Sequence, residues 1–176
     1  MRITILIILI SMFFSTCKTI EYGAKDAQLV KHFDVQQYVG TWYEIYRLPM
    51  RAERDLVNVT ATYELRSDGR IDVLNQGYKH TPTGKHKSAK AIAWQPDKDY
   101  PAALFVRFFH LFKSTYHVLY VDDSYQYAIV STYKRDYAWV LARKPQIPDK
   151  IEQDLKNKAK ECNIDVSQFI KTVQKW

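Results

Sequence analysis

Alternation of polar and apolar residues is the dominant pattern along this chain. Residues 58–65 alternate in this way, which is typical of a strand with one buried face. The alternation resumes at residues 70–75 after the turn sequence at 67–69, so the pattern predicts a β-hairpin. An earlier strand is predicted from Thr41 to Leu48 and ends before Pro49, which has no backbone N–H to donate.

Further segments continue the pattern towards the C-terminus. Strands are predicted at residues 89–94, 104–108, 116–120, 126–131 and 137–143. Short strands at regular spacing favour an all-β fold. Eight antiparallel strands can close on themselves, which removes exposed edges and leaves an interior that can hold one small ligand. The pattern therefore predicts an eight-stranded antiparallel β-barrel.

A different periodicity begins after Pro145 and Pro148. Apolar residues then recur at helical spacing, with lysines and acids on the opposite face. They are Ile151, Leu155, Ala159 and Cys162. We expect a helix that packs this stripe on the barrel wall and ends near Asn163, followed by a short ninth strand at residues 169–173.

Because side chains alternate along a strand, only one parity can face the barrel interior. If Leu104, Val106 and Phe108 face inward, then Phe105 and Arg107 face outward. The alanines among the candidates favour an open lumen over a filled core. Apart from the tyrosines no candidate is ionisable, and Asn75 is polar but uncharged. The candidate lining residues are Ala61, Tyr63, Val73, Asn75, Ala91, Ala93, Leu104, Val106, Phe108, Tyr116, Val118, Tyr120, Ala128, Val130, Trp139 and Leu141.

The N-terminus carries a targeting signal. An apolar run at residues 3–14 follows Arg2, and it has the length of a signal-peptide core but is too short for a membrane span. We therefore assign the chain to three parts. They are a signal peptide at residues 1–16, a tether at 17–35 and a folded domain at 36–176.

Cys17 directly follows the predicted signal peptide. This position resembles the acylated cysteine of bacterial lipoproteins, which implies a lipid anchor in the membrane. Simple cleavage and an uncleaved anchor are the alternatives. Cys162 is then a small apolar residue on a helix face, although a disulfide between the two cysteines is a further alternative in an oxidising compartment.

Composition and charge narrow the function. The chain has 176 residues, of which 47% are hydrophobic, and it contains 13 Tyr, 8 Phe and 4 Trp, which suits one β-rich domain with an apolar ligand site. The formal charge of +7 favours an anionic partner, but no basic-aromatic motif for stacking nucleic-acid bases occurs. The five histidines lack metal-ligand spacing, and no catalytic motif is present. We expect a non-enzymatic protein with no metal, cofactor or nucleic-acid partner.

Three short regions resemble the signatures of the lipocalin family. They are Gly40-x-Trp42, the Asp122-x-x-Tyr125 turn and Arg143 at the end of the last long strand. Longer runs resemble the bacterial outer-membrane lipocalins, a subfamily that also includes apolipoprotein D-like relatives, and the resemblance covers roughly residues 36–173. These runs lie at residues 40–45, 58–63, 75–78 and 135–139.

This resemblance implies a lipocalin calyx, which is an up-and-down barrel with a C-terminal helix on its wall and a short ninth strand. Trp42 and Arg143 are expected to stack at its closed end, whereas Asp122 and Tyr125 are expected to be structural. The resemblance further implies binding, storage or transport of a fatty acid or lysophospholipid at the bacterial outer membrane, or in the periplasm if there is no anchor. The subfamily includes homodimers, so a homodimer is one option here.

Cations gather in the loops that an up-and-down barrel would place at its open end. Arg51, Arg54, Lys134 and Arg135 form an expected rim for an anionic head group, beside the apolar residues Phe109, Leu111 and Phe112. Three other functions are weighed against lipid binding. A lipid-modifying enzyme would need a reactive group in the lumen. A carrier of a tetrapyrrole or other hydrophobic ligand would need an axial ligand, and His117 is predicted to face outward. A purely structural envelope protein would have a packed barrel.

Overall fold

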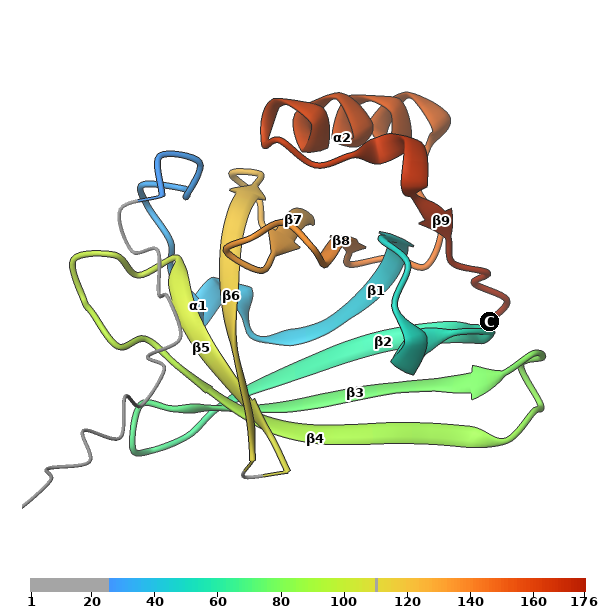
Figure 1. The fold of residues 1–176 in the computed structure, drawn as a ribbon, viewed down its shortest axis with the longest axis horizontal. Coiled ribbons are helices and arrows are strands. Elements are labelled where there is room, and N and C mark those ends of the chain that lie inside the picture. The colour runs from blue at the N-terminus through green and yellow to red at the C-terminus, as the bar shows by residue number, and fades with distance from the viewer. Residues whose placement is uncertain (1–25, 110) are drawn as a thin grey trace, which may run out of the picture.

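The computed structural model describes residues 26–109 and 111–176, and their strands form a barrel (Figure 1). Each strand pairs antiparallel with the next, and the first pairs with both the eighth and the second, which closes the sheet. The all-β fold and the eight-stranded antiparallel barrel are therefore confirmed. The strands are β1 (Gly40–Arg47), β2 (Leu56–Leu65), β3 (Ile71–Lys79), β4 (His86–Trp94), β5 (Ala103–Phe108), β6 (Phe112–Val121), β7 (Tyr127–Ser131) and β8 (Ala138–Ala142).

The predicted hairpin between residues 58–65 and 70–75 is formed by β2 and β3, but β3 and β4 are longer than predicted. Their outer halves are mostly polar and lack an apolar alternation, yet they stay paired through contacts such as Gln76 with Ser88 and Tyr78 with His86. Backbone pairing therefore extends this hairpin, together with a contact between the rings of Tyr78 and His86, whose centroids lie 5.1 Å apart. As a result, β2, β3 and β4 form a long wall, whereas β7 and β8 form a short one (Figure 1).

The helices lie outside or at the ends of the barrel. They are α1 (Val35–Tyr38), the 3-10 turns η1 (Arg51–Glu53) and η2 (Val166–Gln168), and α2 (Asp149–Glu161). α2 lies along the outside near β1, β7 and β8, as predicted (Figure 1). Asn163 ends it with a φ of 61°, a left-handed conformation that asparagine tolerates. Among the described residues, no helix combines the length and apolar character needed to span a membrane.

Two hydrophobic clusters flank the barrel wall. The inner cluster includes Trp42, Val73, Val118 and Val130 and fills the lower part of the lumen. The outer cluster joins Ile45, Ile129 and Val140 to the α2 stripe of Leu155, Ala159 and Cys162. The wall is therefore buried on both faces where α2 covers it, which anchors the helix that the periodicity predicted.

Part of the predicted tether contacts the fold. The amide of Val30 donates to the carbonyl of Val118 at 3.1 Å, and Phe33 is buried in the inner cluster with its ring 5.0 Å from that of Tyr38. Ordered contacts thus begin before residue 36. Cys17 and the predicted signal peptide lie outside the described residues.

The closed end is held by Trp42 and Arg143. The guanidinium carbon of Arg143 lies 3.9 Å from the centre of the fully buried Trp42 ring, as predicted. A Cβ on Gly40, whose φ is +100°, would lie 3.2 Å from this guanidinium, so glycine suits both the conformation and the space. Arg143 also donates to the backbone carbonyls of Gln37, Tyr38, Val39, Thr41 and Tyr125.

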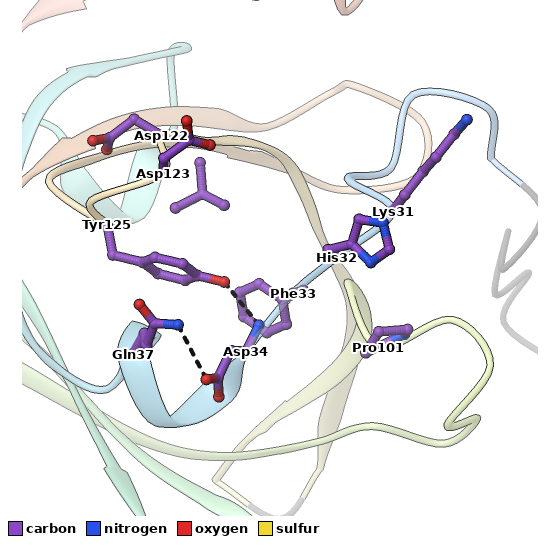
Figure 2. Close-up of a pocket in the computed structure, with 10 residues that line it drawn as sticks. Lys31, His32, Phe33, Asp34, Gln37, Pro101, Asp122, Asp123 and Tyr125 are labelled. Atoms are coloured by element: carbon purple, nitrogen blue, oxygen red, sulfur yellow. Dashed lines mark hydrogen bonds between the residues drawn. The ribbon is translucent and has the colours of Figure 1, made fainter.

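Asp122 and Tyr125 hold the neighbouring turn. One carboxylate oxygen of Asp122 accepts hydrogen bonds from the amides of Gln126 at 2.7 Å and Tyr127 at 2.5 Å. The Tyr125 hydroxyl accepts a hydrogen bond from the amide of Asp34 at 2.8 Å, which ties the turn to the segment before α1 (Figure 2). Both side chains make structural contacts of the expected kind.

The C-terminal tail, residues 170–176, fills a gap between β1 and β2. Its first part is β9 (Ile170–Lys171), which pairs with β1 and is shorter than the predicted ninth strand. Beyond it, the amide of Asn58 donates to the carbonyl of Val173 at 2.8 Å, and the Asn58 side chain exchanges two hydrogen bonds with the backbone of Lys175. The tail therefore joins two strands that part towards the open end.

Candidate ligand site in the barrel lumen

Most of the candidate lining residues face the lumen, as the alternation of side chains along the strands predicted. The apolar candidates other than Tyr120 all belong to the inner cluster or pack against it. They come from β2 to β8, so the lining involves nearly the whole wall. These residues are Ala61, Tyr63, Val73, Ala91, Ala93, Leu104, Val106, Phe108, Tyr116, Val118, Ala128, Val130, Trp139 and Leu141.

Exposure of this inner face increases from the closed end to the open end. Trp42 is fully buried, and Val73 and Ala91 are still only 5% and 7% exposed. Farther up the lumen, Ala61, Phe108 and Trp139 are only partly buried although they face inward. The floor is thus sealed by packed side chains, whereas the upper lumen is accessible from outside.

Asn75 is the polar member of the predicted lining. It alternates with Val73 along β3 and pairs with Ala61 on β2 and Ala89 on β4, so its side chain faces the lumen between small residues. Its buried Oδ1 accepts no hydrogen bond from any described residue. An unpaired buried acceptor has lost hydration without a replacement, which leaves Asn75 able to bind a donor in the lumen.

Tyr120 does not line the lumen, so its prediction was wrong. A bulge between Val118 and Tyr120 shifts the register of β6 against β7, and the residues after it change faces. Tyr120 consequently packs against the outer cluster below α2, while Val121 packs against the inner one. Strict alternation cannot reveal such an extra residue.

Three tyrosine hydroxyls meet in the lower lumen. The hydroxyl oxygen of Tyr116 lies 2.6 Å from that of Tyr38 and 2.9 Å from that of Tyr63. Burial raises the pKa of Tyr63 to about 12 and also raises those of Tyr38 and Tyr116. All three are therefore neutral phenols at physiological pH. Tyr38 was not among the predicted lining residues because it belongs to the short helix α1.

Two charged residues on the inner face were not predicted. Glu44 and Arg47 pair across the sheet with Leu141 and Trp139, which both face inward, so the lumen wall does contain ionisable groups. Glu44 keeps the inward parity of Trp42, whereas a bulge between Glu44 and Tyr46 places Ile45 and Tyr46 together in the outer cluster and thereby turns Arg47 inward. Both charged side chains are buried, at 3% and 4% exposure.

These two residues belong to a buried polar cluster. Arg47 donates to Glu44 and to the Thr172 hydroxyl, each at 3.0 Å, and lies 3.7 Å from the carboxylate of Glu53. Trp139 donates its indole N–H to Glu53 at 3.2 Å. Burial raises the pKa of Glu44 to about 8, an effect that the Glu53 carboxylate increases and Arg47 opposes. Burial likewise raises the pKa of Glu53.

The predicted head-group rim is only partly available. Arg51, Arg54 and Lys134 are exposed on the loops at the open end. Arg135 is instead 13% exposed and forms an ion pair with Asp26 at 2.6 Å, besides donating to the carbonyls of Thr132, Tyr133 and Cys162. Its assignment to the rim was wrong, because a partner far away in sequence holds its guanidinium.

His117 lies on the outer face, as predicted. Its Nδ1 is 3.2 Å from Asp26, and its ring contacts Tyr133. The described residues contain no group of three or more His, Cys, Asp or Glu side chains placed to hold a metal ion. Cys162 belongs to the outer cluster, so its free thiol does not face the lumen. Burial raises the pKa of this thiol.

Two surface cavities border the barrel. One of about 500 Å³ lies beneath the closed end, where Asp34, Gln37 and Tyr125 surround it (Figure 2). Another of about 1140 Å³ is lined mainly by outward-facing residues of β2, β3 and β4, such as Glu64, Asp72 and Ile92, and only Val73 and Ala91 of the predicted lining border it. Neither cavity coincides with the inner face described above.

Exposed apolar side chains mark the tip between β5 and β6. Phe109, Leu111 and Phe112 are 61%, 78% and 68% exposed. Large apolar side chains gathered at such exposure are uncommon on a soluble domain and are typical of contact surfaces. The tip lies at the open end of the barrel, so it extends the apolar surface of the lumen outward.

Comparisons with known proteins agree with this architecture. A family model described as a lipocalin-like domain matches residues 33–174. The outer membrane lipoprotein Blc of Escherichia coli (strain K12) is 42% identical over 142 residues, which cover 81% of this chain and 80% of that protein. Apolipoprotein D of Mus musculus is 31% identical over 151 residues, covering 82% and 78%. Lobster apocrustacyanin A1 shares the fold with a TM-score of 0.68 at 16% identity, over 89% of this chain and 88% of that one.

Proposed function

Because the chain belongs to the lipocalin family, whose members bind small hydrophobic molecules, we propose that it binds a fatty acid or lysophospholipid in the barrel lumen for storage or transport. The observation that carries this proposal is the gradient of exposure along the inner face. Inward-facing Ala61, Phe108 and Trp139 are only partly buried, whereas Trp42 at the floor is fully buried. An apolar chain that enters from the open end would cover the partly buried surface.

The charge at the mouth supports an anionic head group. Arg51, Arg54 and Lys134 are exposed there, beside the apolar tip formed by Phe109, Leu111 and Phe112. Cations can hold a carboxylate or phosphate at the water boundary while the acyl chain occupies the lumen. The inward-facing acids and arginine are engaged with one another, which suits a binding protein better than a lipid-modifying enzyme.

Substitution of a small lining residue tests the proposed lumen. Ala91→Trp puts a bulky ring on the inner face, so we expect loss of fluorescent fatty-acid binding from a protein that still gives the far-UV spectrum of a β-barrel. Ile92→Trp is the matched control, because Ile92 is the next residue on β4 and faces outward. Binding that survives Ala91→Trp, or falls equally in both variants, would place the ligand outside the lumen.

The cell envelope is the proposed location. Relatives named outer membrane lipoprotein Blc support it, and Cys17 follows a signal-peptide-like segment. We propose that acylated Cys17 tethers the barrel to the bacterial outer membrane. Cys17→Ser should move the protein from the membrane fraction to the soluble fraction, since no acyl chain could then attach. Continued sedimentation with membranes would instead favour an uncleaved anchor.

A further inference from the structure

The three tyrosine hydroxyls in the lower lumen have one proton more than their mutual hydrogen bonds can use. Each phenol has a single O–H to donate and an oxygen that can accept two hydrogen bonds. Tyr116 bonds with both Tyr38 and Tyr63, at 2.6 and 2.9 Å. Whichever direction each bond takes, these two contacts use two of the three protons. One O–H is therefore left for an acceptor outside the triad.

Burial indicates which hydroxyl has the remaining proton. Tyr38 and Tyr63 are 2% and 6% exposed, whereas Tyr116 is only partly buried and faces the lumen. A buried O–H without an acceptor loses the hydrogen bonds that water would provide. The arrangement that satisfies both buried phenols has each of them donate to the Tyr116 oxygen. The O–H of Tyr116 then points to whatever occupies the lumen.

The charges around the triad favour a neutral acceptor. Farther along β1, Arg47 forms ion pairs with Glu44 and with Glu53 of η1. This cluster therefore contains two acids and one arginine. Below the floor, Arg143 directs its guanidinium to backbone carbonyls and to the face of Trp42. A carboxylate at the triad would lose its hydration and gain only one hydrogen bond, from a phenol, which is unfavourable. A ketone, ester carbonyl or alcohol needs only one donor.

We propose that Tyr116 donates a hydrogen bond to a neutral oxygen in the buried part of a lumen ligand, so that the Tyr38–Tyr63–Tyr116 triad is a subsite for oxygenated apolar chains. This inference rests on the proposed lumen binding and adds to it. A lipid with its charged head group at the cationic mouth and a hydroxyl or keto group along its chain would satisfy both ends of the site.

A matched pair of neutral ligands tests the subsite. Methyl nonyl ketone and n-undecane have equal numbers of carbon atoms, and their affinities can be measured by displacement of aminoanthracene from the purified domain. We expect Tyr116→Phe to weaken ketone binding about three- to tenfold, the range for one neutral hydrogen bond, and to leave undecane binding unchanged. Tyr120→Phe is the control, because it removes a hydroxyl from the outer face of the same strand.

A further measurement keeps the test independent of the folding of one variant. In wild-type protein, the carbonyl stretch of an isotope-labelled ketone should move to lower wavenumber than in hydrocarbon solvent. An unshifted stretch, or equal changes for ketone and undecane in Tyr116→Phe, would overturn the subsite alone. If the ketone, undecane and dodecanoate all fail to displace the probe from wild-type protein, lumen binding itself is refuted.

Discussion

Glu44 faces the lumen because it lies two residues after the inward-facing Trp42 on β1, and the bulge that follows it turns Ile45 and Tyr46 to the outside and Arg47 to the inside. Its carboxyl is buried beside a second acid, Glu53, with a single arginine between them. Burial and this second acid together favour the protonated form, which explains the pKa of about 8. A proton thus stabilises the cluster at neutral pH.

The cluster makes stability depend on pH in a defined direction. The folded-state pKa of Glu44 is raised from its ordinary value of 4.5, so the folded protein binds this proton more tightly than the unfolded chain. The stabilisation is complete below about pH 4.5 and is lost as pH rises through about 8. We therefore expect the free energy of unfolding to fall between these values, and Glu44→Gln to reduce that fall.

Urea denaturation at several pH values measures this effect. Glu64→Gln is the control, because Glu64 is an exposed acid on the outer side of β2. The control should retain the wild-type slope. If Glu44→Gln and Glu64→Gln gave the same dependence of unfolding free energy on pH, the Glu44 proton would not contribute to stability.

Some side-chain contacts were predictable from the sequence and others were not. The stacking of Arg143 on Trp42 followed from an arginine and a tryptophan in matching signature positions, and it is confirmed. Tyr120 and Arg135 were misplaced for different reasons. A bulge reversed the face of Tyr120, and Arg135 binds Asp26, which lies in the segment assigned to a tether. Neither a bulge nor a distant ion pair leaves a periodic signal in the sequence.

At the scale of elements, the C-terminal tail is a part of the barrel. Gln174 donates to the carbonyls of Glu44 on β1 at 2.8 Å and Val59 on β2 at 2.9 Å. Asn58 receives and donates side-chain hydrogen bonds with Lys175 while its backbone has a φ of 50°. These bonds satisfy backbone groups that β1 and β2 cannot satisfy for each other where they separate.

Removal of the Asn58 side chain should therefore weaken the closure. Asn58→Gly tolerates the positive φ but loses both bonds to Lys175, and we expect a loss of about 1–3 kcal/mol in the free energy of unfolding. Asn163→Gly is the control, because Asn163 also has a positive φ, of 61°, but is exposed after α2. Guanidinium denaturation measures both, and equal stability of the two variants would argue against the tail as a structural link.

The strands and the main helix were predictable because their buried faces repeat. Alternation located the strands, and the spacing of Ile151, Leu155 and Ala159 located α2. The short α1 and the contacts of residues 26–34 were not predicted, since segments of this length have no complete period. The outer halves of β3 and β4 were missed for a related reason, because their side chains are mostly polar.

For the molecule as a whole, charge is distributed unevenly between the two ends. Arg51, Arg54 and Lys134 are exposed at the mouth, whereas Asp122 and Asp123 border the cavity beneath the closed end. Such a distribution attracts anions to the entrance, with a strength that falls as salt is added. Two roles are compatible with this distribution, namely a binding site with a head-group preference and a basic surface that only maintains solubility.

Neutralising the mouth separates these two possibilities. Arg51→Gln, Arg54→Gln and Lys134→Gln together should weaken lysophosphatidic acid binding about three- to tenfold at low salt and reduce its salt dependence, because exposed charges contribute modestly. A monoacylglycerol of equal chain length should bind as before. The control combines Arg70→Gln with Lys98→Gln, both exposed at the closed end. Equal losses for the charged and neutral lipids would show that the mouth has no head-group selectivity.

The position of the C-terminal tail also bears on when the barrel can fold. β1 is near the start of the domain, yet its partners are β2, β8 and the last residues of the chain, and Asn58 bonds to Lys175 across most of the sequence. Pairings so distant in sequence form slowly, because the entropy of closing a long loop is lost before the contacts can stabilise the chain. The wall therefore cannot be completed until residues 170–176 have been synthesised, so a nascent chain that stops short of them leaves β1 and β2 unlinked where they separate.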